Sequence, residues 1–131
     1  MLLVQLSDPH IVEAGELLLG GIDTASFLRA AVEHVNGLDP QPDLVLLTGD
    51  LVNEGRPAQY DHLRRLLEPL QAPCHLVPGN HDLTEELRSA FPECVHGGDG
   101  RADARPVRSE PRRALRPVGP TRAGGADRAL L

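Results

Sequence analysis

The sequence lacks any long hydrophobic run, and it contains no lysine and only two cysteines. No segment approaches the ~20 apolar residues that span a bilayer, so we expect no membrane partner. The first apolar run has no basic residue before it and is interrupted by Gln5 and Asp8, so we expect no signal peptide and a cytoplasmic location. Cys74 and Cys94 lack C-x-x-C spacing, which favours free thiols.

Charge is distributed unevenly along the 131 residues, whose formal net charge is −6. Residues 1–96 contain 15 Asp and Glu against 5 Arg, whereas residues 97–131 contain 8 Arg against 4 acids. The acidic first part argues against nucleic acid as a specific partner, although carboxylates that hold a metal do not repel a phosphate. We therefore predict a domain over residues 1–96 and a separate tail over residues 97–131.

The predicted tail is rich in Arg, Pro, Gly and Ala and has no aromatic residue, Ile or His. Such a segment buries too little apolar surface to offset its ordering entropy, so we predict that it is disordered. Because every basic residue is Arg, the abrupt change near residue 97 suggests a GC-rich gene read out of frame. A genuine tail and a natural truncation are the alternatives, and the lack of aromatic residues disfavours specific binding of nucleic acid.

Three short apolar runs predict buried parallel strands, and helical patterns separate them. The runs are residues 2–6, 44–47 and 75–77, and each stops at Gly, Pro or Asp. The first predicted helix begins after Asp23 and ends near residues 36–37, with a face formed by Phe27, Ala31, His34, Val35 and Leu38. The second begins near Pro57 and carries an apolar face of Tyr60, Leu63, Leu66, Leu67 and Leu70.

A third predicted helix runs from Thr84 to Phe91, with Asp82 or Thr84 as its N-cap and Pro92 after its end. The fold class is therefore α/β, with the element order β-α-β-α-β-α up to about residue 92.

A short polar motif follows each of the three apolar runs. The motifs are Ser7-Asp8-Pro9-His10, Gly49-Asp50 and Gly79-Asn80-His81-Asp82. In an open α/β sheet, the loops at the carboxyl ends of the strands meet at one crevice, where ligands bind. Carboxylate, imidazole and amide groups suit Mn, Fe, Co or Zn ions better than Ca. The pattern therefore indicates a dinuclear metal site.

These motifs, in this order and with these spacings, resemble the first half of the calcineurin-like metallophosphoesterase family. Residues 5–10 and 77–82 are most similar to the bacterial class III 3′,5′-cyclic nucleotide phosphodiesterases. The resemblance covers roughly residues 1–95 and implies the β-α-β-α-β-α start of the family's two-sheet sandwich. It also implies a hydrolase of a small-molecule phosphodiester, with cyclic AMP as the leading candidate.

The resemblance implies a ligand set for two divalent ions, which clamp the attacking and leaving oxygens of a displacement at phosphorus. Asp8 and His10 hold the first ion, Asp50 bridges both ions, and Asn80 offers its amide oxygen to the second.

The resemblance further implies that His81 is catalytic and protonates or stabilises the leaving oxygen. By the same resemblance, we expect Asp82 to orient the His81 imidazole, and Asn80 and His81 to contact the substrate.

In one respect the sequence departs from the family pattern. The family completes its site with an isolated His and a G-H-x-H motif, whereas this sequence has no His after His96. We therefore expect impaired catalysis, and an incomplete sandwich whose uncovered apolar face favours self-association. Another phosphoester substrate, or a noncatalytic truncated fragment, is the alternative.

Each motif alone is also consistent with ordinary turn chemistry at a strand end. The joint occurrence of three motifs favours a site, because their roles coincide at one crevice. We interpret His34, His62 and His75 as packing or surface residues, and Asn53, Glu54 and Arg56 as a solvated loop.

Overall fold

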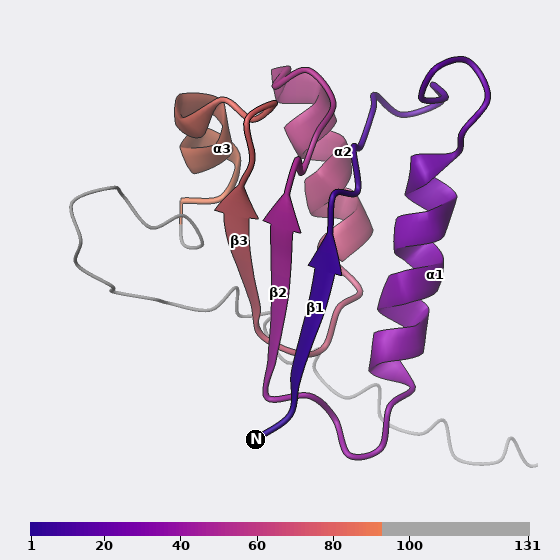
Figure 1. Ribbon diagram of the computed structural model, residues 1–131, viewed down its shortest axis with the longest axis vertical. Helices are drawn as coiled ribbons and strands as arrows, with labels where there is room; N and C mark the ends of the chain where they lie inside the picture. The colour runs from indigo at the N-terminus through magenta and orange to yellow at the C-terminus, as the bar shows by residue number, and fades with distance from the viewer. Residues whose placement is uncertain (93–131) are drawn as a thin grey trace, which may run out of the picture.

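The computed structural model describes residues 1–92, and these residues alternate between strands and helices. The elements are β1 (Leu3–Ser7), α1 (Thr24–Asn36), β2 (Leu44–Gly49), α2 (Pro57–Leu67), β3 (Cys74–Pro78) and α3 (Thr84–Ala90) (Figure 1). This order confirms the predicted α/β class and the β-α-β-α-β-α arrangement. The predicted tail over residues 97–131, its disorder and its origin, together with Cys94 and His96, lie outside the described residues.

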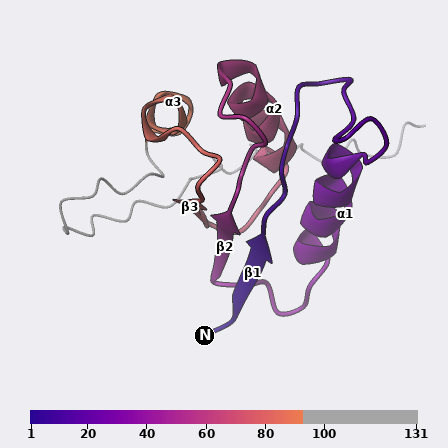
Figure 2. The same cartoon turned by 45° about the horizontal axis from the view of Figure 1, so that its top comes forward.

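The three strands form one parallel sheet in the order β1-β2-β3, so β2 is central. Gln5 pairs with Leu46, and Leu46 pairs with His75, across the sheet. Successive right-handed crossovers in one direction place α1 and α2 on the same face of the sheet (Figures 1 and 2). Because the strands are parallel, their carboxyl ends lie at the same end of the sheet, and the loops that follow them come together there.

The hydrophobic core lies between the helices and the face of the sheet that they cover. Alternate strand residues point into it, because successive side chains of a strand face opposite sides. Each fully buried aliphatic side chain contributes about 1.5–3 kcal/mol relative to an exposed one. The core includes Val45, Leu47, Leu76, Leu28, Val32, Val35, Tyr60, Leu63 and Leu87.

The opposite face of the sheet is covered by none of the described helices (Figure 2). Leu3 is 45% exposed and Val77 is 49% exposed, and Leu44 and Leu46 between them are only partly buried. Parallel sheets are normally buried on both faces. Among the described residues this face carries these apolar side chains beside polar ones such as Gln5 and Thr48, and it is where we expect the apolar surface that the sequence predicts.

We expect the 131-residue chain to self-associate through this face, and Leu3→Gln to lower the associated fraction. The reason is that exposed apolar area and a free strand edge favour pairing with another molecule. Light scattering after gel filtration measures the associated fraction. Phe27→Gln is the control, because Phe27 is 70% exposed on α1, on the helical side of the sheet. A monomeric unmodified chain that binds no apolar dye would contradict the prediction.

Two local predictions are wrong. Phe27 and His34 do not belong to the buried face of α1, which consists of Thr24, Ala25, Leu28, Val32 and Val35. The side chain of Asp23 accepts a hydrogen bond from the Ser26 N–H and caps the helix as predicted, and this start leaves Phe27 on the outer side. The N-cap of α3 is Leu83, not Asp82 or Thr84.

Candidate metal centre

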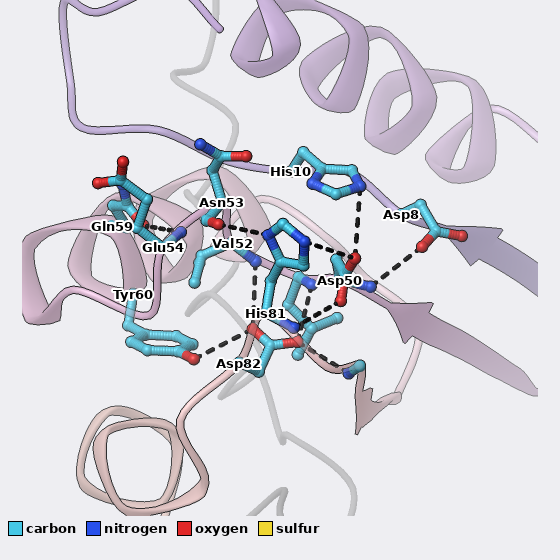
Figure 3. A network of polar contacts seen from close by, with 12 residues as sticks. Asp8, His10, Asp50, Val52, Asn53, Glu54, Gln59, Tyr60, His81 and Asp82 are labelled. Carbon is cyan, nitrogen blue, oxygen red and sulfur yellow. Dashed lines mark hydrogen bonds and ion pairs between the residues drawn. The ribbon is translucent and has the colours of Figure 1, made fainter.

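The polar motifs meet at the edge of the sheet where the three strands end (Figure 3). Asp8 and His10 follow β1, Asp50 follows β2, and His81 lies in the turn after β3. The strands are parallel, so these motifs, more than 30 residues apart in sequence, lie side by side.

His10, Asp50 and His81 form a group whose ligand atoms lie within 4.8 Å of one another. The Nε2 atoms of His10 and His81 lie 3.7 Å and 3.8 Å from Asp50 Oδ2. These separations are too long for hydrogen bonds. Ligands of a tetrahedral ion with bonds of about 2.1 Å are about 3.4 Å apart, so the two separations from Asp50 are close to the spacing of ligands around one ion. The donors are two imidazoles and a carboxylate, which suit a divalent transition metal.

The Asp50 carboxylate is fixed by the turn after β3. Its Oδ1 atom accepts a hydrogen bond from the His81 N–H at 2.9 Å, while Oδ2 faces the two imidazole rings. The Asp50 N–H in turn donates to Asp8 Oδ1 at 3.1 Å. Asp50 is only 9% exposed, so these contacts hold a buried carboxylate with one oxygen directed at the candidate ion position.

Two residues of the motif directly after β1 are in the left-handed backbone region. Asp8 has φ +52° and His10 has φ +42°. Left-handed residues other than glycine cost about 1–3 kcal/mol each and cluster at functional sites. Here two main-chain hydrogen bonds maintain them, from Asp8 N–H to the Thr48 carbonyl and from His10 N–H to the Asp50 carbonyl. The loop after β1 is thus held against the loop after β2.

The His81 ring is oriented by a main-chain carbonyl. Its Nδ1 atom lies 2.7 Å from the Asn53 oxygen, and because a carbonyl only accepts, Nδ1 carries the proton. Nε2 is left facing Asp50, and the ring meets that of His10 edge-on, with centroids 5.5 Å apart. We expected Asp82 to orient this ring, but Asn53 holds that position. No sequence signal marks this contact, since every residue has a carbonyl.

Asp82 lies beneath the site with its carboxylate fully hydrogen-bonded (Figure 3). Its Oδ2 accepts from the N–H groups of Leu51 and Gly79, at 3.0 Å and 2.9 Å. Its Oδ1 accepts from the Val52 N–H at 3.2 Å and the Tyr60 hydroxyl at 3.0 Å. The side chain is buried, so its role in the structure is to join the segment after β2 to the turn after β3.

The other polar residues considered from the sequence lie in different parts of the structure. Asp8 and Asn80 are exposed, Asp8 beside Asp50 and Asn80 next to His81 in the chain, and His34 is exposed on α1. His62 is buried and its Nδ1 lies 2.7 Å from the Val12 carbonyl. These contacts agree with its interpretation as a packing residue. Arg56 pairs with Glu13 and Glu54 at 3.3 Å and 2.6 Å.

Burial raises the pKa of the Tyr60 hydroxyl well above its usual range, the hydrogen bond from the Leu83 N–H offsets part of this rise, and the charges of Asp82 and Glu86 raise the pKa again. The folded chain therefore binds this proton more tightly than the unfolded chain, and stability falls as pH rises above ~10. We expect a loss of up to about 1.4 kcal/mol per pH unit, absent in Tyr60→Phe. The sequence has one Tyr, no Trp and no Lys, so tyrosinate absorbance reports this group alone. Ionisation of the folded chain near pH ~10 would contradict the expectation.

Comparison with known proteins agrees with the metal-ligating geometry at the strand ends. The family model described as calcineurin-like phosphoesterase matches residues 1–113. The chain belongs to this family, whose members are metal-dependent phosphoester hydrolases, and the earlier resemblance is confirmed. Family membership implies divalent metal ions, and the His10, Asp50 and His81 group fits one.

Several curated proteins are similar to the chain. It is 38% identical over 93 residues to the "Probable glycerophosphodiester phosphodiesterase GpdQ" of Arcobacter nitrofigilis, covering 71% of this chain and 34% of that protein. It is 43% identical over 90 residues to the "3′,5′-cyclic adenosine monophosphate phosphodiesterase CpdA" of Pseudomonas aeruginosa, covering 69% and 33%. A "cAMP/cGMP dual specificity phosphodiesterase" of Mycobacterium tuberculosis is 39% identical over 90 residues, covering 66% and 28%.

The chain spans about a third of the length of the curated relatives that it matches. Among the described residues, no helix is long and apolar enough to cross a membrane.

Proposed function

We propose that the protein hydrolyses a small-molecule phosphodiester, with a 3′,5′-cyclic nucleotide as its substrate and cyclic AMP as the first to test. The observation that supports this best is the convergence of His10, Asp50 and His81, from three different loops, within 4.8 Å. A group of two imidazoles and a carboxylate at the carboxyl edge of a parallel sheet matches the chemistry of the family to which the chain belongs.

We propose two divalent ions, drawn from Mn, Fe, Zn and Co, with Asp8 and His10 holding the first ion, Asp50 bridging and Asn80 contacting the second. When bound, the ions would neutralise charge on the phosphoryl oxygens. The chain supports this assignment in two ways. Asp50 directs one oxygen at the rings and is anchored through the other, and Asp8 is hydrogen-bonded to the Asp50 main chain.

His81 is proposed as the proton donor. Its Nδ1–H is held by the Asn53 carbonyl, so the proton for the substrate would have to be a second one, on Nε2. In this role His81 would not be an ion ligand, and His10 and Asp50 would be the members of the group that hold ions. In the reaction, water adds to phosphorus, the phosphorus–oxygen ester bond breaks, and the proton on Nε2 passes to the leaving oxygen. The proton that the water loses restores the one on Nε2. Asn80 and His81 are neighbours in the chain and both are exposed, and we propose that they contact the phosphodiester. Asp82, proposed from the family resemblance as catalytic, acts on the His81 turn through its main-chain contacts.

The names of the relatives divide the substrate question into two candidates. Relatives named for cyclic nucleotides include those of Pseudomonas aeruginosa and Mycobacterium tuberculosis, and they favour a cyclic nucleotide. Relatives named glycerophosphodiester phosphodiesterase favour a glycerol phosphodiester as the second candidate. Both substrates contain a phosphodiester group, so the chemistry proposed for the candidate metal centre is compatible with either one.

We further propose that the 131-residue chain is impaired in catalysis. The family resemblance calls for additional His ligands, and the sequence contains no His after His96. Misplacement of reacting groups by about 1 Å can cost ~100-fold in rate, and missing ligands should cost more.

Assays of cyclic AMP and glycerophosphocholine hydrolysis with Mn²⁺ test these proposals. The purified chain should show little turnover of either compound. A gene product in which another reading frame after codon 96 restores the His residues should hydrolyse cyclic AMP and lose that activity on His81→Ala. Robust turnover by the 131-residue chain, abolished by Asp8→Ala, would overturn the proposed impairment. A restored product that cleaves only glycerophosphocholine would overturn the cyclic-nucleotide assignment.

A further inference from the structure

Tyr60 connects helix α2 to the candidate metal centre although it contacts none of the proposed ligands. Its ring is fully buried in the core, and its hydroxyl lies beneath the site. The hydroxyl donates to Asp82 Oδ1 at 3.0 Å and accepts the Leu83 N–H at 2.9 Å. The single proton of the hydroxyl is thus committed to Asp82 (Figure 3).

The other contacts of Asp82 place Tyr60 in a larger unit. The carboxylate accepts N–H groups from Leu51 and Val52, the two residues after Asp50, and from Gly79. Leu51 and Val52 continue directly from the proposed bridging ligand, and Gly79 begins the turn that presents His81. The Asp82 carboxylate is therefore the point at which these two segments are joined.

From these contacts we propose that Tyr60 is a positioning residue, which fixes the Asp82 carboxylate and thereby sets the separation of Asp50 from His81. The role in metal binding rests on the proposed function, whereas the positioning itself does not. Without the hydroxyl, Asp82 Oδ1 keeps only the 3.2 Å contact to Val52, and the Leu83 N–H loses its partner. An unpaired buried group costs about 1–3 kcal/mol, so the local structure would shift to satisfy both.

A purely packing role for Tyr60 makes a different prediction. Phe has the same ring, so Tyr60→Phe would preserve the contacts with the core and leave the turns above the ring unchanged. A positioning role requires the hydroxyl itself. Measuring the mobility of the turns at the site distinguishes the two roles, whereas measuring overall stability does not.

The experiment compares Tyr60→Phe with Leu67→Val. Leu67 is buried on the same helix and its apolar side chain forms no hydrogen bond, so its substitution lowers stability without touching the site. In the metal-free chains, amide hydrogen exchange is measured at Leu51, Val52 and Gly79, together with the ¹⁵N shifts of the His81 ring. In the same chains, Mn²⁺ affinity is measured by calorimetry.

Tyr60→Phe should accelerate exchange at the three amides, shift the His81 ring signals and weaken Mn²⁺ binding roughly 10-fold, the lower end of the loss for residues behind metal ligands. Leu67→Val should change none of these. Asp82→Asn, which also leaves the ring packing intact, should give the same pattern with larger changes.

Exchange and ring signals in Tyr60→Phe that match those of the unmodified chain would overturn the proposal. Equal changes in Leu67→Val would do the same, since they would reflect stability alone. If the unmodified chain binds no Mn²⁺, that result counts against the proposed metal assignment, while the metal-free exchange still decides the role of Tyr60.

Discussion

Replacing Asp50 by Asn should nearly abolish Mn²⁺ binding. The substitution keeps the shape of the side chain but removes the only carboxylate in the group formed with His10 and His81. Loss of a residue behind the ligands typically costs 10–100-fold in metal affinity, so loss of this ligand charge should cost more than about 100-fold. The amide also has one oxygen instead of two, so it cannot both accept the His81 N–H and offer an oxygen to the ion.

Calorimetric titration with Mn²⁺ at neutral pH measures the affinity. Asp61→Asn is the matched control, because it makes the same chemical change at an exposed position of α2. His34→Ala is a second control, which removes an exposed imidazole outside the site. Equal affinity in Asp50→Asn and the unmodified chain would refute the assignment of Asp50 as the shared ligand.

Replacing Gly79 by Ala should disrupt the site and the fold around it. A Cβ atom at Gly79 would lie 2.3 Å from Asp50 Oδ1 and 2.6 Å and 2.7 Å from the main chain of Gly49 and Asp50. Gly49 and Asp50 lie at the end of the central strand, so their main chain cannot shift without disturbing the sheet. We expect the free energy of unfolding to fall by about 1–3 kcal/mol, as in overpacked cores.

The same substitution should also weaken Mn²⁺ binding by at least about 10-fold, because it displaces the Asp50 carboxylate and the Gly79 N–H that donates to Asp82. Urea unfolding and calorimetry measure the two effects. Gly21→Ala is the control, since a Cβ there meets no atom within 4 Å and its backbone needs no positive φ. Similar results for the two variants would show that the close approach of the turn to Asp50 is not required.

The elements of the fold were predictable because each depends on neighbouring residues. The apolar runs before Asp8, Asp50 and Asn80 became β1, β2 and β3, and Pro57 begins α2 as expected. The predicted face of α1 is wrong at Phe27 and His34, because several three- and four-residue spacings are possible in that segment. Only packing against the sheet selects one of them.

The site was predictable in its residue types and only partly in its contacts. Asp8, His10, Asp50 and His81 come together because parallel strands end at one edge, which the strand pattern implies. The Asn53 carbonyl and the Tyr60 hydroxyl were missed. Tyr60 was interpreted as a core residue, and its ring is one, but the partner of its hydroxyl depends on how α2 meets the turn after β3.

The sequence by itself determined the α/β order, the metal-ligand types and the family, because these follow from local patterns of apolar and polar residues. The tertiary structure alone decided which atoms face one another. It placed the Asp82 carboxylate against four donors, and it assigned the His81 ring to the Asn53 carbonyl. The physical reason is that a buried polar group must find partners wherever packing brings donors and acceptors together, and those partners are distant in sequence.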